Sequence, residues 1–226
     1  MIVYMYNIAD KYFLPRGYLS YSAMNDFYYN RKRFQDKYYR GIESPVTPEL
    51  IFGKKIGELL EHGDESLAHI SHGDVAEKRL DFKVDGIPIL GYIDSFRTDD
   101  SFIFEFKTGK TPWTQGRVNK HFQLDVYSLG VEITEGKVND ECMLIWMETR
   151  KVEKKLEGRC SHASAYEIEF TGKVKEFTRT ITKDDRAATY DKIVTIAQDI
   201  SEDYTDWLST QEKNQSRFVV KEGRGV

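Results

Sequence analysis

Two carboxylates and one lysine near the middle of the chain have spacings that could bring them into one site. Glu105 and Lys107 are two residues apart, and side chains two apart on a strand point to the same face. A tight turn at Asp99-Asp100 would pair their strand with the preceding one and set Asp94 opposite Glu105. Carboxylate oxygens and water are the ligands that Mg²⁺ prefers, and a lysine beside them could contact a phosphate or the attacking water. The pattern therefore indicates metal-assisted chemistry on a phosphate ester.

A third carboxylate joins this group if an earlier hairpin has the expected register. Asp85-Gly86 is a strong signal for a two-residue turn and would set Glu77 opposite Asp94. Like charges that face each other across a sheet destabilise it by roughly 0.2–1 kcal/mol per pair, so a row of carboxylates requires a reason, and a divalent cation supplies one. The alternative interpretation is a solvent-facing hairpin that happens to be charged. A register slip of one residue would also move the side chains of a whole strand to the other face.

The elements that would position this group alternate between helices and strands. Apolar residues at helical spacing predict helices over residues 20–40, 48–61, 115–131 and 184–209. In the second of these, Leu50, Ile51 and Ile56 are expected to face inward. Strands are predicted over residues 80–84, 87–94, 102–107, 143–147, 165–170 and 174–182. We therefore expect an α/β fold, a central mixed β-sheet flanked by α-helices, as a single domain over residues 1–210 with a flexible tail over residues 211–226.

The composition excludes several classes of protein. The chain has 226 residues with a formal net charge of −4, which argues against a protein that coats nucleic acid through bulk positive charge. An enzyme with an acidic metal site inside a locally basic cleft stays possible. No stretch approaches the roughly 20 apolar residues of a membrane helix, so no membrane partner is expected. Two cysteines make no disulfide framework, and we expect the reduced environment of the cytoplasm.

The strand residues also resemble a known family. Gly91-Tyr92-Ile93-Asp94 and Glu105-Phe106-Lys107-Thr108-Gly109, followed by Gln123 and Tyr127, resemble the signature of RecB-like nucleases of the PD-(D/E)XK superfamily. This branch includes CRISPR-associated and phage exonucleases, and the resemblance runs in order over about residues 19 to 147. It implies a restriction-endonuclease-like core. Without the strand motif, Gln123 and Tyr127 could simply be a surface pair one helical turn apart.

The resemblance also implies roles for single residues. Asp94 and Glu105 would hold the metal, Lys107 would serve the nucleophile, and Gln123 and Tyr127 would face the cleft as further catalytic residues. Many relatives carry a histidine on the preceding helix, where this chain has Gly57. Other branches use a glutamate there, so the open position is left to Glu58 or Glu61, with His62 as a weaker candidate. The remaining candidate metal ligands are Glu77 and Phe106.

The implied cofactor is Mg²⁺, for which Mn²⁺ would substitute. Some relatives hold an iron–sulfur cluster with four cysteines, and this chain has only two, so we expect no cluster. His69, His72, Cys142, Cys160 and His162 lack the spacing of a zinc site and are expected to be structural.

The implied activity is hydrolysis of DNA phosphodiester bonds by an exonuclease of recombination, repair or phage DNA processing. DNA, as single strands or duplex ends, is the expected partner in a bacterial, archaeal or phage-infected cell, with a homo-oligomer or a recombination protein as further candidates. Two alternatives stay open: an RNA-directed nuclease, and a nuclease-fold protein that binds DNA or a partner without cutting. The retained Lys107 favours an enzyme, because a binding module has no evident use for the complete triad.

A second set of residues could also contact nucleic acid. Basic residues alternate with tyrosines in the first predicted helix, where the charges could bind phosphates and the rings could stack on bases. An ordinary amphipathic helix explains the same pattern equally well. The basic residues concerned are Arg31, Lys32, Arg33, Lys37 and Arg40.

Overall fold

The computed structural model describes residues 11–153 and 166–222, and beyond residue 211 it describes only the course of the backbone. The chain divides into two compact units. One comprises Met1–Glu43, Lys83–Leu90 and Tyr190–Val226, and the other comprises Ser44–Phe82 and Gly91–Thr189. The single domain expected over residues 1–210 stays a prediction. Among the helices of the described part, none combines the length and the apolar composition that crossing a bilayer requires.

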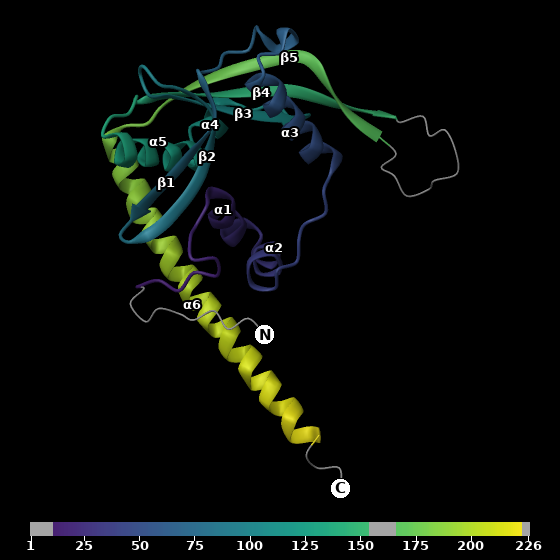
Figure 1. The fold of residues 1–226 in the computed structure, drawn as a ribbon, viewed down its shortest axis with the longest axis vertical. Helices are drawn as coiled ribbons and strands as arrows, with labels where there is room; N and C mark the ends of the chain where they lie inside the picture. Colours follow the sequence, from purple (N-terminus) through teal and green to yellow (C-terminus); the bar gives the residue numbers. More distant parts are fainter. Residues whose placement is uncertain (1–10, 154–165, 223–226) are drawn as a thin grey trace. The chain divides into compact units, whose positions relative to one another are not determined.

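A five-stranded mixed sheet holds the strands in chain order (Figure 1). The third strand pairs antiparallel with the second and parallel with the fourth, and the fourth pairs antiparallel with the fifth. Helices flank this sheet, so the predicted α/β class with a central mixed sheet is confirmed. The strands are β1 (Val75–Val84), β2 (Ile87–Arg97), β3 (Phe102–Gly109), β4 (Glu141–Glu153) and β5 (Tyr166–Thr180).

The hairpin between β2 and β3 has the register that the sequence predicts. Ser95 pairs with Phe104 and Arg97 pairs with Phe102, and one further step sets Asp94 opposite Glu105. The β1–β2 turn is also as predicted, because Asp85 and Gly86 take φ values of 50° and 83°, the left-handed pair that a type I′ turn requires. Glu77 in β1 has a φ of 48°, outside the extended region of an ordinary strand, and its predicted position opposite Asp94 stays a prediction.

Two helices cover opposite faces of the sheet in the unit that contains Gly91–Thr189. Ile56 of α3 (Pro48–Glu61) lies in one buried cluster with Phe104 of β3. Three residues along the same strand, Lys107 points to the other face and donates a hydrogen bond to a residue of α5 (Phe122–Glu135). The strand β3 therefore presents apolar side chains to α3 and its charged pair to α5.

The first turn of α3 differs from the prediction. Ile56 is buried as expected, whereas Leu50 and Ile51 are 62% and 60% exposed. The reason is that the apolar cluster under this helix reaches only as far as Phe52, so the two preceding residues have no core to face. The predicted inward orientation of Leu50 and Ile51 was wrong.

Two predicted helices are interrupted. Asn30 breaks the first, because its backbone takes φ −149° and ψ 65° and its side chain accepts a hydrogen bond from the Arg33 N–H. The chain likewise leaves the helical path between Val118 and Phe122. The resulting segments are α1 (Tyr21–Tyr29), α2 (Arg31–Phe34), a π-helical turn (Gln35–Tyr39), α4 (Gln115–Val118) and α5, and a 3₁₀ turn (Glu65–Leu67) follows α3.

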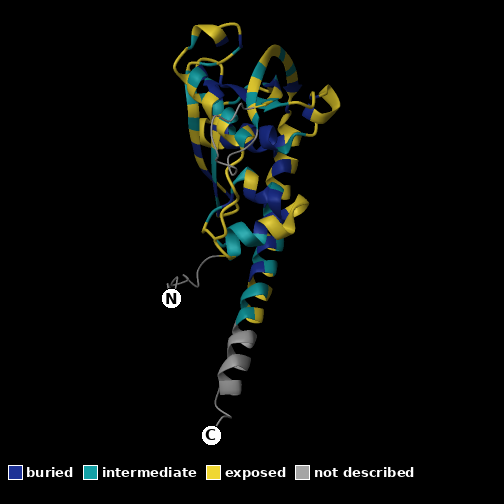
Figure 2. Cartoon of the chain, turned by 90° about the vertical axis from the view of Figure 1, so that its right-hand side faces the viewer, coloured by how far each residue is buried: buried dark blue, intermediate teal, exposed yellow. Residues whose placement is uncertain are grey.

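The last helix and the last strands are longer than predicted. The helix α6 (Lys183–Glu222) contains no glycine or proline, so nothing in its sequence ends it before Gly223. The expected tail is therefore helical as far as Glu222, and its flexibility stays a prediction. Two predicted strands are one strand, β5, and the structure describes nothing of residues 154–165 before it. Buried residues recur at helical spacing along α6, as predicted (Figure 2), at Ile193, Ile196, Ala197, Ile200 and Tyr204.

Candidate active site

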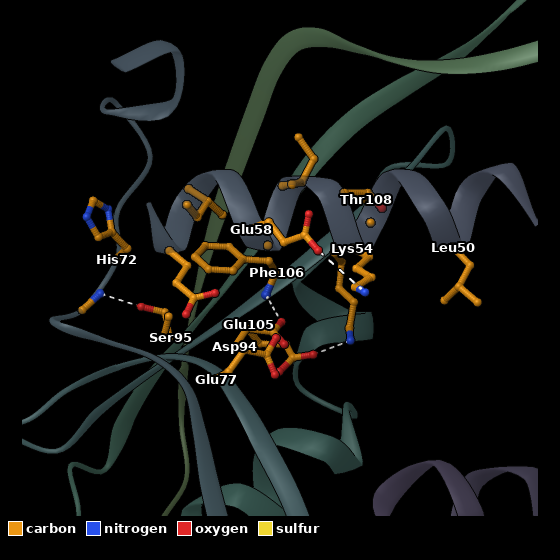
Figure 3. A pocket seen from close by; sticks show the side chains of 18 of the residues that line it. Leu50, Lys54, Glu58, His72, Glu77, Asp94, Ser95, Glu105, Phe106 and Thr108 are labelled. Atoms are coloured by element: carbon orange, nitrogen blue, oxygen red, sulfur yellow. Dashed lines mark hydrogen bonds and ion pairs between the residues drawn. The ribbon is translucent and has the colours of Figure 1, made fainter. Parts of the chain in front are cut away.

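The predicted catalytic residues come together on β2 and β3. The Lys107 ammonium donates a hydrogen bond to the Glu105 carboxylate two residues earlier on the same strand. On the neighbouring strand, Asp94 accepts a hydrogen bond of 2.7 Å from the main-chain N–H of Phe106. Figure 3 shows the Asp94 and Glu105 side chains beside each other in one cavity. Sheet alternation and a short turn thus produce the grouping that the spacing predicted.

Glu105 is a buried carboxylate whose hydrogen bonding is incomplete. It is 1% exposed, and its Oε2 atom has no hydrogen-bond partner. The pKa of Glu105 is raised to about 8, chiefly by burial, with the Asp94 charge adding to the rise and the Lys107 charge opposing it. A buried polar atom without a partner costs about 1–3 kcal/mol, and more when it is charged. The site would therefore gain from a cation placed at this oxygen.

The donor set fits a hard divalent cation. Burial also raises the pKa of Asp94, against the Lys107 charge and the Phe106 N–H. In the described part of the chain, no three His, Cys, Asp or Glu side chains form a ready-made metal centre. Mg²⁺ does not require one, because it takes one or two protein carboxylates and keeps several waters. The Asp94 carboxylate and the unpartnered Oε2 oxygen of Glu105 suit that mode of binding. Phe106 contributes an N–H donor to Asp94, and its ring packs against the apolar cluster under α3.

Of the glutamates considered for the open ligand position, Glu61 lines the same cavity as Asp94 and Glu105 and lies close enough to Glu77 for its charge to act on it. Burial raises the pKa of Glu77, and the charges of Asp94 and Glu61 raise it further, so Glu77 lies near both of these carboxylates. Glu58 instead forms an ion pair of 3.7 Å with Lys54 on the same helix (Figure 3).

The two other positions on α3 that the sequence raised do not supply a ligand. The His62 ring nitrogen Nδ1 lies 2.6 Å from the Glu58 carbonyl oxygen, and His62 does not line the cavity. A Cβ at Gly57 would meet no atom within 4 Å, so that position is open space.

Gln123 and Tyr127 form a hydrogen-bonded chain behind Lys107. The Lys107 ammonium donates to Gln123 Oε1 at 2.9 Å, and Gln123 Nε2 donates to the Tyr127 hydroxyl at 2.9 Å. Both side chains are buried, so the alternative of a surface pair is wrong. Gln123 lines the cavity, whereas Tyr127 lies behind it and does not. The pair therefore fixes where the lysine points.

Gly91 is a residue of this site to which the sequence gave no role. A Cβ at Gly91 would lie 2.9 Å from Cε1 of the Tyr127 ring, which is too close for a carbon contact. A glycine inside a strand often marks such an approach, and that was the available signal. Gly91 thus makes room for the tyrosine that holds Gln123.

The cavity containing these residues is acidic rather than basic. It has a volume of about 1160 Å³ and lies within one of the two units. Two lysines, Lys54 and Lys107, line it. They face seven carboxylates, so the described residues of the cavity do not form the locally basic cleft that the sequence left possible. The seven are Glu49, Glu58, Glu61, Asp74, Glu77, Asp94 and Glu105.

Four of the five basic residues near the N-terminus form ion pairs within their own unit, and Lys37 lies over the Tyr38 ring. Asp36 binds Lys32 at 2.6 Å and Arg40 at 2.7 Å. Arg33 pairs with Asp26 and Arg31 pairs with Asp203, at 3.4 Å and 3.9 Å. These ion pairs favour the amphipathic-helix interpretation over a face dedicated to phosphates.

The histidines and cysteines considered for zinc lie in ordinary surroundings. Cys142 is buried, and burial raises the pKa of its thiol to about 12. The His72 ring nitrogen Nδ1 is 2.8 Å from the Ile70 carbonyl oxygen, and His69 is exposed. Cys160 and His162 lie outside the described residues.

Comparison with known proteins gives matches in structure only. No family model matches the chain, and no curated protein matches it. Among solved structures, it is similar to a protein described as a "Putative exonuclease" from Eubacterium rectale, with 12% identity, a TM-score of 0.48, and coverage of 87% of this chain and 88% of the other. It is also similar to SSO0001, with 14% identity, a TM-score of 0.41, and coverage of 86% and 71%. Neither similarity assigns the chain to a family.

Proposed function

We propose that this chain is a divalent-metal-dependent nuclease of the RecB-like PD-(D/E)XK type, an exonuclease that hydrolyses DNA phosphodiester bonds. The observation that carries the proposal is the Glu105 carboxylate, fully buried beside Asp94, with one oxygen bound by Lys107 and the other without a partner. A purely structural carboxylate would be expected to have both oxygens satisfied. The incomplete one supports a site that a ligand completes.

The proposed roles of the site residues follow from the chemistry of their side chains. Asp94 and Glu105 would hold a Mg²⁺ or Mn²⁺ ion, with Glu61 or Glu77 as further ligands. Such an ion, when bound, neutralises charge on the phosphoryl oxygens and lowers the pKa of water. Lys107 is a poor ligand for Mg²⁺ but a good partner for a phosphate oxygen or the attacking water. The Gln123–Tyr127 chain would hold its ammonium toward the scissile phosphate.

The test is incubation of the purified protein with end-labelled single-stranded DNA, duplex DNA and RNA, in Mg²⁺, Mn²⁺ or EDTA. We expect cleavage with either metal and none in EDTA, and release of nucleotides from one end would identify an exonuclease. Lys107→Ala serves as the inactive control. If wild-type protein binds DNA but cuts no nucleic acid with any divalent metal, a binding protein with this fold replaces the enzyme.

The metal content gives a second check. Hard oxygen donors suit Mg²⁺ or Mn²⁺, so protein purified without oxygen should contain neither zinc nor an iron–sulfur cluster at stoichiometric level. A visible absorption band from a cluster would contradict this assignment.

A further inference from the structure

Exposed aliphatic side chains line the same cavity as the carboxylates. Val46, Leu50 and Ile51 are 69%, 62% and 60% exposed, and all three contribute to the cavity wall at the start of α3. We call these three residues the aliphatic ledge. Figure 3 shows Leu50 on α3, along the helix from Glu58. Exposed apolar side chains gathered in a concave site, rather than scattered over a surface, indicate contact with an apolar part of a ligand.

The charges of the cavity limit what that ligand can be. Seven carboxylates and two lysines are among the described residues that line the cavity, and both lysines form ion pairs, Lys54 with Glu58 and Lys107 with Glu105. Proteins that follow a nucleic-acid backbone use a positively charged groove, and the described residues of this cavity do not form one. Beyond the phosphate at the metal site, the cavity therefore favours the uncharged parts of a nucleotide.

The uncharged part with the largest apolar surface is the base. In a duplex the faces of the bases are covered by stacking, whereas in a single strand they are free to contact protein side chains. The volume of about 1160 Å³ exceeds the roughly 300–1,000 Å³ of ordinary ligand pockets, which leaves space for more than one nucleotide.

We propose that the aliphatic ledge binds unstacked bases at the end of a single-stranded nucleic acid whose scissile phosphate lies at Asp94 and Glu105. The inference rests on the proposed nuclease function and specifies its substrate as single-stranded. The binding is mainly apolar, and it sets the Michaelis constant more than the chemical step.

The first experiment removes the ledge and leaves the catalytic residues intact. The double variant Leu50→Ser/Ile51→Ser should weaken binding of labelled oligo(dT) in Mg²⁺, and raise KM for its cleavage, by about tenfold, with little change in kcat. Cleavage of methyl p-nitrophenyl phosphate, which has no base, should be unchanged. The matched control is Ile133→Ser, since Ile133 is 43% exposed on α5 and does not line the cavity.

The second experiment removes the same contact by changing the nucleic acid, which is given terminal residues without bases. Wild-type protein should bind an oligonucleotide with abasic terminal residues about tenfold more weakly than oligo(dT), and the ledge variant should not distinguish the two. Two lysines line the described part of the cavity, and if they make the phosphate contacts, the slope of log affinity against log salt should be about −1.4.

The possible outcomes separate this inference from the proposed function. Equal oligo(dT) binding by wild type and the ledge variant, or a wild-type preference for duplex DNA, overturns the ledge. If instead wild type self-associates through the ledge, light scattering will show a dimer that the variant lacks, with unchanged DNA binding, and this too overturns the proposal. If wild type cleaves neither DNA nor the small ester but binding still depends on the ledge, the nuclease function alone fails.

Discussion

Among the buried charged groups beside α5, the Arg179 guanidinium and the Glu105 carboxylate differ in how completely their hydrogen bonding is satisfied. The Arg179 guanidinium is 9% exposed and donates to the carbonyl oxygens of Val118 and His121, at 3.3 Å and 2.9 Å, and to the Asp125 carboxylate. At Glu105, one carboxylate oxygen accepts a hydrogen bond from Lys107, and the other, Oε2, has no hydrogen-bond partner. The Arg179 cluster joins β5 to α5, and the guanidinium has hydrogen-bond acceptors at that contact. The Glu105 carboxylate is even less exposed, yet one of its two oxygens lacks a donor.

The difference teaches how a structural charge can be told from a functional one in this protein. Desolvation penalises both, and hydrogen bonds compensate it at Arg179 but only in part at Glu105. At Glu105, binding a cation would recover this cost. The following changes test this contrast, from the largest expected effect to the smallest.

The largest effect on stability should come from breaking the satisfied cluster. Arg179→Ala leaves Asp125 buried without its cation and should lower the free energy of unfolding by about 3–5 kcal/mol, measured by urea denaturation. Replacing both partners, as Arg179→Met with Asp125→Leu, should recover most of this loss. If the double variant is no more stable than Arg179→Ala, the ion pair is not what holds these elements together.

The largest effect on rate should come from Lys107. Lys107→Ala should reduce cleavage by about 10²–10³-fold, because the lost group stabilises charge mainly in the transition state, while binding of metal and DNA stays near the wild-type level. The exposed Lys173, which pairs with Glu148, provides the control, and Lys173→Ala should cut normally. Asp94→Ala should instead weaken the metal itself, so excess Mn²⁺ should restore some activity to it and none to Lys107→Ala.

Glu105 should give the metal-free protein a distinctive pH dependence. Its folded pKa is about 8 against an ordinary value of 4.5, so between these values the folded protein retains a proton that the unfolded chain releases. The free energy of unfolding in EDTA should therefore fall as the pH rises from about 4.5 to about 8. Denaturation of Glu105→Gln over this window should show a shallower fall, and parallel curves for the two proteins would contradict the assignment.

The smallest effect should come from the residues that position Lys107. Gln123→Ala removes one hydrogen bond to the ammonium, worth about 0.5–1.5 kcal/mol, and should lower kcat by up to about tenfold with KM unchanged. Gly91→Ala should act similarly, because its Cβ displaces the Tyr127 ring. Gly57→Ala, where a Cβ meets nothing within 4 Å, should leave kcat unchanged. Equal loss of kcat in all three variants would show a general disturbance rather than positioning.

What the sequence by itself determined is the part of the site that local rules control. The Asp99-Asp100 turn signal and the two-residue period of a strand predicted the β2–β3 register, and with it the meeting of Asp94, Glu105 and Lys107. Apolar periodicity likewise predicted the helices, although their interruptions followed from backbone conformations such as that of Asn30. These features depend on residues close together in the chain.

Only the tertiary structure decided the surroundings of that site. No local rule could show that Gln123 reaches Lys107, that Gly91 makes room for Tyr127, or that seven carboxylates would gather in the cavity. The exposure of Leu50 and Ile51 is of the same kind, because their helical spacing matches that of core residues and only the end of the apolar cluster at Phe52 leaves them outside it. The register of a hairpin is set by residues close together in the sequence. The burial of a side chain and the net charge of a cavity depend instead on residues from distant parts of the chain that pack next to each other in the fold.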